Sequence, residues 1–260
     1  MITLNIKIKM KKILLIIIIL FCQNSNSQAL KKIFQESSET VLRLVDDIAP
    51  KTVKKISIYS IKNLKQLEKQ GFLLIKKSDD VYDIFSKNNE FLGVLRKNQI
   101  TATPGVSSKN FNKLININKL LPNTTYKLGQ AIYKTDNLGR VIEVYVARLP
   151  KSIVKSSRSK MNQGLTVLEK DGIKGIDDGG HLIANSLGGI SEKINYIPQN
   201  STLNRGKWNK LEQKVLLNRK YIKDYSIKVI YEGESMRPKY LKMSFENKGI
   251  KESYNFINHV

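Results

Sequence analysis

The chain has 260 residues, 41% hydrophobic and 26% charged, a balance that argues against a disordered protein and against a multi-pass membrane protein. The chain has 45 Lys and Arg against 22 Asp and Glu, which gives a net charge of +23. Two explanations compete for this basic excess: binding to nucleic acid or another anionic partner, and compositional bias. The two histidines, His181 and His259, exclude a multi-histidine zinc site and an HExxH metalloprotease.

Residues 1–27 have the pattern of a secretory signal peptide. Two lysines precede an apolar run over residues 13–22, and residues 25–27 form a small-x-small cleavage pattern. Because this run is about half of the ~20 apolar residues that span a membrane, a transmembrane anchor is the weaker alternative. Lipidation of Cys22, the single cysteine, is disfavoured by the bulky Phe21 before it. We therefore expect a secreted or periplasmic protein with no stable membrane association after cleavage and no disulfide.

Residues 28–110 are predicted to form a helical and hairpin region whose function the sequence does not reveal. Apolar residues recur at helical spacing before Pro50 and again before Gly71, and both residues are suited to end a helix. Short runs typical of strands follow, with a tight turn between the last two, and then a stretch typical of a linker. The strand-like runs cover residues 72–75, 81–85 and 91–95, the turn covers residues 87–89 and the linker covers residues 101–108.

The remaining residues, 111–260, are predicted to form a second domain. Residues 131–135 and 141–147 alternate as strands around a turn at residues 136–140, which implies an antiparallel sheet. This region carries a net charge of +13, against +6 for residues 28–110. Most of the basic excess therefore accompanies the second domain.

The first candidate site lies at residues 177–184, Asp-Asp-Gly-Gly-His-Leu-Ile-Ala. Glycines before His181 allow the backbone to approach a ligand closely, and the apolar run after it suits a buried strand. This arrangement would expose one imidazole at the edge of a cleft. A structural histidine without catalytic function is the alternative.

The second candidate site lies at residues 195–212, where a polar loop runs into a helix. The amide oxygen of Asn204, near the start of this helix, is suited to a hard cation, and Glu212, two turns later, could reach a water in the ion's shell. The alternative is an ordinary amphipathic helix capped by Asn204. The apolar face of the helix would consist of Trp208, Leu211 and Val215.

Together, the two segments resemble the DNA/RNA non-specific endonucleases of the ββα-metal (His-Me finger) class. The closer likeness is to the EssD-like branch found among type VII secretion toxins and other polymorphic toxins. The resemblance covers roughly residues 115–250 and leaves residues 28–110 outside. It implies an α+β fold in which a ββα-metal domain with an antiparallel sheet follows the N-terminal region.

The resemblance implies a role for each matching residue. His181 matches the family's general base, Asn204 its single direct ligand for Mg²⁺, and Glu212 the acidic residue that holds metal-bound water. Mn²⁺ is the alternative ion. Other matching positions are Gln199, assigned to substrate binding, and Asp178 and Asn195, assigned to support of the site.

One position departs from the family's Asp-Arg-Gly-His motif, because Gly179 stands in place of the arginine, as it also does in the EssD-like branch. The phosphate contact of that arginine must then come from another cation. The candidates are Arg158 and Arg205, with Lys207 a weaker one. His259, next to the C-terminus, is expected to be solvated and without function.

These residue types suit phosphodiester hydrolysis. An imidazole with an ordinary pKa of about 6.5 can take a proton from water near neutral pH, and a hydrated cation can stabilise the charge on the phosphorane. Binding through lysines and phosphates carries no base information, so DNA and, by family inference, RNA are the expected substrates.

Several alternatives stay open at this point. A non-enzymatic nucleic-acid-binding protein, or a protein that binds a membrane surface or cell wall, would use the same basic surface. A nuclease could be an antibacterial toxin with an immunity partner, or it could scavenge or take up nucleic acid. The signal peptide slightly favours scavenging.

Overall fold

The computed structural model describes residues 62–105, 110–150 and 159–259, which all fall in one of the two units of the chain. The predicted signal peptide, the first predicted helix and Arg158 lie outside these residues. Among the described residues, no helix has the length and apolar character needed to cross a membrane.

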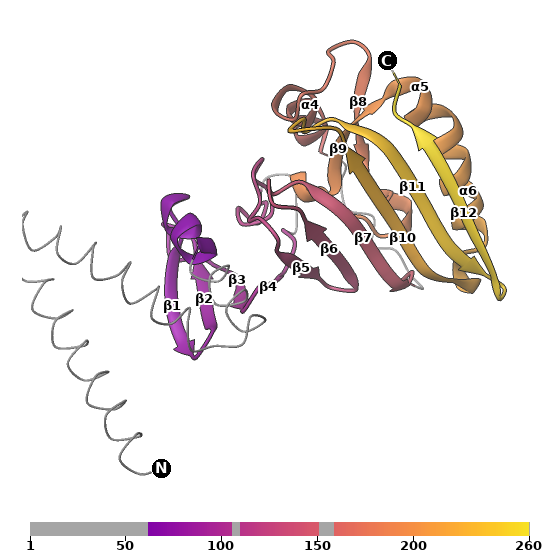
Figure 1. Ribbon diagram of the computed structural model, residues 1–260. Coiled ribbons are helices and arrows are strands. Elements are labelled where there is room, and N and C mark those ends of the chain that lie inside the picture. Colours follow the sequence, from indigo (N-terminus) through magenta and orange to yellow (C-terminus); the bar gives the residue numbers. More distant parts are fainter. Residues whose placement is uncertain (1–61, 106–109, 151–158, 260) are drawn as a thin grey trace, which may run out of the picture. The chain divides into compact units, whose positions relative to one another are not determined.

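A ten-stranded sheet forms the framework of the described unit (Figure 1). Adjacent strands of this sheet are antiparallel, except for β4 and β5, which run parallel. The strands in spatial order are β1 (Leu73–Ser78), β2 (Val81–Phe85), β3 (Phe91–Arg96), β4 (Gln99–Ala102), β5 (Thr125–Leu128), β6 (Ala131–Thr135), β7 (Val141–Arg148), β10 (Ile222–Tyr231), β11 (Pro238–Asn247) and β12 (Ile250–Ile257).

The predicted strands before residue 100 are confirmed, and Gly71 ends the helical residues 62–69 as expected. It has φ +85°, and the amide of Phe72 donates to the carbonyl of Leu67. This bond and the positive φ form the usual C-terminal motif of a helix. The expected linker is wrong in part, because residues 99–102 form strand β4 through pairing with β3 and β5. That pairing depends on distant neighbours, which local composition does not encode.

The sheet runs through the predicted domain boundary at residue 110. Strand β4 comes before that boundary and β5 after it, and they pair directly. The side chain of Asn63 also donates to the hydroxyl of Thr124 across the same boundary, at 3.0 Å. Residues 62–105 and the following strands therefore share one sheet and one apolar core.

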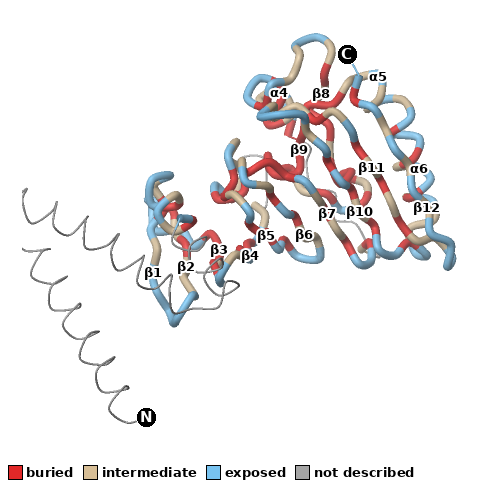
Figure 2. Tube along the Cα trace, in the orientation of Figure 1, coloured by how far each residue is buried: buried red, intermediate tan, exposed pale blue. Residues whose placement is uncertain are grey.

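Burial alternates along β7, β10 and β11, as expected for strands with one covered face (Figure 2). The helix α6 (Asn209–Leu217) lies along β12 (Figure 1), where Trp208 meets Phe256 edge-on at 5.3 Å. The predicted apolar face of this helix is confirmed, because its three members are buried: Trp208, Leu211 and Val215.

A second, two-stranded sheet carries the glycine–histidine segment. It consists of β8 (Asp177–His181) and β9 (Tyr196–Asn200) and is followed by α5 (Ser201–Leu203), a π-helical turn (Asn204–Trp208) and α6. The predicted α+β fold, with two strands followed by a helix, is confirmed. The helix α4 (Lys160–Glu169) packs against β8 and β9, and short 3₁₀ turns lie at Asn185–Leu187, Lys193–Asn195 and Arg219–Tyr221.

Candidate active site at the end of β8

His181 is the last residue of β8 and lies opposite Tyr196 of β9. The two rings are 4.5 Å apart between centroids, with an angle of 47° between their planes. The expectation that a buried strand follows His181 is wrong, since the strand precedes it. Residues 182–184 are buried in an irregular segment instead, because their backbone leaves the hairpin for the loop toward β9.

The two glycines before His181 are required by close packing. A Cβ on Gly179 would lie 2.3 Å from the carbonyl oxygen of Gln163 in α4, and a Cβ on Gly180 would lie 2.1 Å from the side-chain oxygen of Gln199. Any larger residue would force one of these neighbours away. The motif arginine has no room at position 179, which explains the departure from the family pattern in physical terms.

Asn195 fixes the loop that follows His181. Its side chain is fully buried and donates to the carbonyls of Ile183 and Ile190, each at 2.9 Å. Its side-chain oxygen accepts from the amide of Ile183 and from the hydroxyl of Tyr133 on the large sheet. Asn195 therefore supports the site from below the surface and does not line it.

Asp178 joins the two predicted segments by bonding to residues 26 and 27 positions later in the chain. Its carboxylate accepts two bonds from the guanidinium of Arg205, at 2.7 and 2.9 Å, and one from Nδ2 of Asn204 at 3.0 Å. The hydrogen bond from Arg205, followed by that from Asn204, holds the pKa of Asp178 below its usual value. Because Nδ2 of Asn204 is engaged, its side-chain oxygen is the atom left to accept from water or bind a cation.

The helical segment after β9 is irregular where it passes the site. Residues 204–208 form a π-helical turn, and Gly206 has the non-helical angles φ −99° and ψ −107°. Such turns occur often at functional sites. The indole nitrogen of Trp208 donates to Glu212 at 2.9 Å, which fixes the carboxylate one turn farther along the helix.

His181, Asn204, Arg205 and Glu212 line one cleft of about 250 Å³. The four side chains come from the end of β8, the π-helical turn and α6, so the structure brings together both predicted segments. The lining is mostly polar, and its other members are Gln163, Ala184, Asn185, Ser186, Asn209 and Gln213.

Of the residues assigned to substrate binding, Gln199 and Lys207 do not line this cleft. Gln199 is fully buried beneath Gly180, so direct contact with substrate would require it to leave its packed position. Lys207 is exposed on the π-helical turn and lies outside the lining of the cleft. Arg158 lies outside the described residues.

Sequence reasoning missed several polar residues of the cleft. Asn209 lies three residues before Glu212 and four before Gln213, so the helical repeat could have placed Asn209 beside both of them. Gln163 comes from α4, a segment without any motif, and only the packing of α4 against β8 brings it here.

Two buried ionic contacts hold the hairpin in place. Asp177, whose side chain is fully buried, accepts two bonds from the guanidinium of Arg237, at 2.7 and 2.8 Å. On the other side, the ammonium of Lys170 donates to the backbone oxygens of Lys193 and Tyr196, each at 2.8 Å. Burial lowers the pKa of Lys170 to about 7.

Comparison with known proteins assigns much of the described part of the chain to a class of nucleases. The family model of the DNA/RNA non-specific endonucleases matches residues 122–249. The chain therefore carries a domain of this family, which confirms the resemblance seen in the sequence.

Curated relatives of the chain include the type VII secretion system protein EssD from two strains of Staphylococcus aureus. Each is 32% identical over 181 residues, which cover 63% of this chain and 29% of the relative. The chain thus spans less than a third of the length of these relatives.

Similar solved structures include an Sda1 nuclease with a bound zinc ion and an extracellular endonuclease. The first is 27% identical with a TM-score of 0.30, over 33% of this chain and 39% of that one. The second is 16% identical with a TM-score of 0.36, over 50% of this chain and 79% of that one.

Proposed function

We propose that the chain hydrolyses phosphodiester bonds of DNA and RNA without sequence specificity, with His181 as general base. The observation that carries this proposal is the polar cleft in which His181, Asn204, Arg205 and Glu212 converge. Membership of the nuclease family supports the same reaction class. The residues proposed for catalysis and metal binding all lie within residues 111–260, whereas residues 62–105 extend the same sheet and have no assigned function.

Each side chain has a task that its position suits. His181 at the cleft wall takes the proton from the attacking water. Arg205 holds the phosphate, because its side chain is 75% exposed and its two bonds to Asp178 use only Nε and Nη2, which leaves Nη1 as a donor. Asp178 keeps the amide of Asn204 oriented and limits the motion of Arg205.

The donor set of the cleft fits a hard divalent cation. In the part of the chain that the structure describes, no three His, Cys, Asp or Glu side chains gather as a metal-binding group. An ion in the cleft would therefore rely on the side-chain oxygen of Asn204, with Glu212 holding water beside it, which suits the water-rich coordination of Mg²⁺. When bound, the ion supplies positive charge that stabilises the transition state. Mn²⁺ is the alternative ion.

The net charge of +13 on residues 111–260 supports a polyanionic substrate. Contacts between basic side chains and phosphates carry no base information, so cleavage should not depend on sequence. Because such contacts are weakened by salt, cleavage should fall steeply between about 50 and 200 mM salt. A non-enzymatic nucleic-acid-binding protein would show the same salt response without cutting.

For the biological setting, we propose export through the signal peptide at residues 1–27 and a role outside the cytoplasm. Two roles compete. A scavenging nuclease fits the signal peptide, whereas the likeness to a type VII secretion protein favours a toxin, which would need an immunity partner. A small acidic protein encoded next to this chain, able to block cleavage, would decide for the toxin.

The test is digestion of plasmid DNA, single-stranded DNA and RNA with added Mg²⁺, Mn²⁺ or Zn²⁺. His181→Ala should lower the rate by about 100-fold or more, since a general base contributes that much. His259→Ala, which changes the other histidine, serves as the matched control and should leave the rate unchanged. A loss of less than about tenfold in His181→Ala, or full activity in EDTA, would contradict the mechanism.

A further inference from the structure

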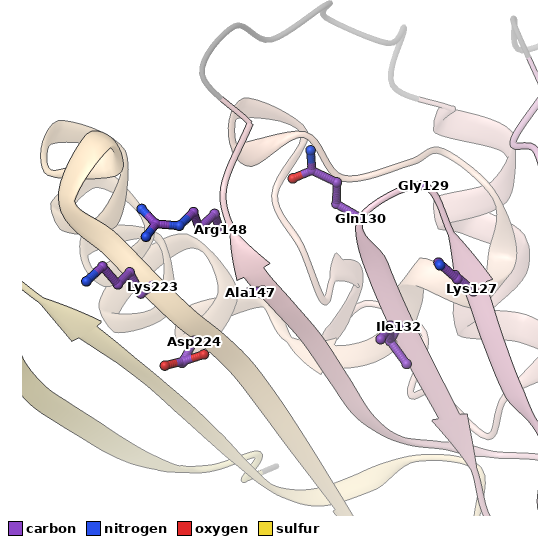
Figure 3. Close-up of a pocket in the computed structure, with 8 residues that line it drawn as sticks. All are labelled: Lys127, Gly129, Gln130, Ile132, Ala147, Arg148, Lys223 and Asp224. Atoms are coloured by element: carbon purple, nitrogen blue, oxygen red, sulfur yellow. The ribbon is translucent and has the colours of Figure 1, made fainter.

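A second cavity, larger than the candidate active site, lies at the end of the large sheet. Its volume is about 470 Å³. It is built by the turn between β5 and β6, the end of β7 and the start of β10 (Figure 3). None of its residues belongs to the His181 cleft.

Three cations line this cavity, which we call the basic groove. Arg148 and Lys223 lie side by side on neighbouring strands, and Lys127 lies beyond β6 on β5 (Figure 3). Within the described residues, Lys127 and Arg148 form no ion pair, and Lys223 is 3.6 Å from Glu246. The groove therefore carries cations that are not neutralised by the fold.

The one carboxylate of the groove already has a partner. Asp224 accepts a hydrogen bond of 2.6 Å from the hydroxyl of Tyr145, and its φ of +49° belongs to a bulge at the start of β10. The lining thus holds three cations and one carboxylate, and one of the cations, Lys223, also pairs with Glu246 outside the lining. Between the three cations lie Ile132 and Ala147, and most of the exposed lining surface is apolar. This combination suits a chain of phosphates with apolar sugar faces between them.

The groove has the right dimensions for a strand of nucleic acid. Lys127 and Lys223 are on strands three positions apart in the sheet, so they are separated by about 14 Å. That distance is the rise of about four nucleotides at 3.4 Å each.

The groove also lies within reach of the same polymer that occupies the cleft. Pro150, two residues after Arg148, packs against Gly188, where a Cβ would lie 2.8 Å from the proline ring. Ser186, two residues before Gly188, lines the cleft. Two extended residues span at most about 7 Å, so Arg148 and Ser186 are separated by at most about 20 Å, which is the rise of no more than about six nucleotides.

We infer that the basic groove is a second binding site for the phosphate backbone of DNA or RNA, within about six nucleotides of the His181 cleft along the strand. The identity of the polymer rests on the proposed nuclease function, but binding at the groove does not require cleavage. The groove adds affinity for long substrates and no base specificity.

The test compares two triple variants in the His181→Ala background, so that binding is measured without cleavage. The groove variant is Lys127→Gln, Arg148→Gln and Lys223→Gln. The matched control removes the same charge from exposed lysines elsewhere: Lys65→Gln, Lys69→Gln and Lys76→Gln. Fluorescence anisotropy measures the Kd of single strands of about 20 and about 4 nucleotides against salt.

For the long strand, the groove variant should bind at least about tenfold more weakly at 0.1 M salt, with a salt slope smaller by about 2. The short strand cannot reach the cleft and the groove at once, so its binding should weaken much less than that of the long strand. The inference is overturned if the groove and control variants behave alike, or if both strands are weakened equally. It is also overturned if only binding to phosphatidylserine vesicles is lost.

Failure of the nuclease proposal would look different. A wild-type chain that cuts no substrate, yet loses long-strand binding in the groove variant, would contradict cleavage and leave the second site standing. Conversely, if the same two sets of three substitutions are made in the chain that keeps His181 and both variants cut plasmid with the wild-type KM, the nuclease proposal stands and the groove is removed.

Discussion

Gly179 offers a sharp test of the packing at the candidate active site. We expect Gly179→Ala to destabilise the protein even though it adds a single methyl group. The backbone of Gly179 has no positive φ, so alanine meets no conformational barrier there. The cost arises from contact alone, because the added Cβ would meet three backbone atoms of Gln163, at 2.3, 2.5 and 2.7 Å.

The size of the effect follows from these distances. Carbon atoms pack best at about 3.5 to 4.0 Å, so α4 must move away from β8 by about 1 Å. Overpacking of this kind costs about 1 to 3 kcal/mol, and the lower entropy of the unfolded alanine variant returns about 0.5 kcal/mol. We expect a net loss of about 2 kcal/mol, equivalent to a fall in Tm of about 4 to 8 °C.

Urea denaturation followed by circular dichroism measures this loss. The matched control is Gly164→Ala, in α4 itself, where an added Cβ would meet nothing within 4 Å. Alanine in that helix should stabilise the protein by about 0.5 to 1 kcal/mol. If Gly179→Ala is as stable as the wild type while Gly164→Ala behaves as expected, α4 does not pack on β8 as described.

Gly179→Arg extends the test to function. The substitution restores the arginine of the family motif, so a sequence-based argument predicts a gain in activity. The structure predicts the opposite, because α4 would be displaced and Gln163, which lines the cleft, would move with it. Activity at or above the wild-type level, in a stably folded variant, would refute the packing argument.

Three further predictions concern the residues that hold the hairpin and loop. In the folded protein the pKa of Lys170 is about 7, below the 10.5 of the unfolded chain, so the folded state binds fewer protons between these two pH values. The free energy of unfolding should therefore rise by about 1 kcal/mol per pH unit from pH 7 to 9. Urea titrations of Lys170→Met should lack this slope. Asn195→Ala should cost about 3 kcal/mol in the same assay, because it leaves buried backbone groups without their hydrogen bonds, and a loss below about 1 kcal/mol would count against the role of Asn195. Arg237→Met should lower the free energy of unfolding by about 3 kcal/mol, because Asp177 would stay buried as an unpaired charge, whereas Arg96→Met at an exposed position should change little.

Much of the local structure could be predicted from the sequence. The alternation of residues 131–147 gave the strands β6 and β7, and the apolar spacing after Asn204 gave the buried face of α6. These patterns repeat within a few residues, so a short window of sequence contains them. The expected linker at residues 101–108 was wrong in part because strand β4 is held by partners on both sides, one of them more than 20 residues away.

The candidate site was predictable in its chemistry but not in its contacts. His181, Asn204 and Glu212 could be named because few residue types can take a proton or bind a hard cation. The burial of Gln199 and the ion pair between Asp178 and Arg205 could not be foreseen. Both depend on the register of β8 against β9 and on where the π-helical turn passes the hairpin.

The sequence by itself was enough to predict an export signal, to show the basic excess, to indicate the nuclease family and to name the residues able to take a proton or bind a cation. Only the tertiary structure decided which of them share a cleft, why glycine occupies position 179, and which cations gather in the basic groove. The physical reason is that periodicity and residue chemistry are local properties. Contacts between segments tens of residues apart arise only when strand register and helix packing bring those segments together.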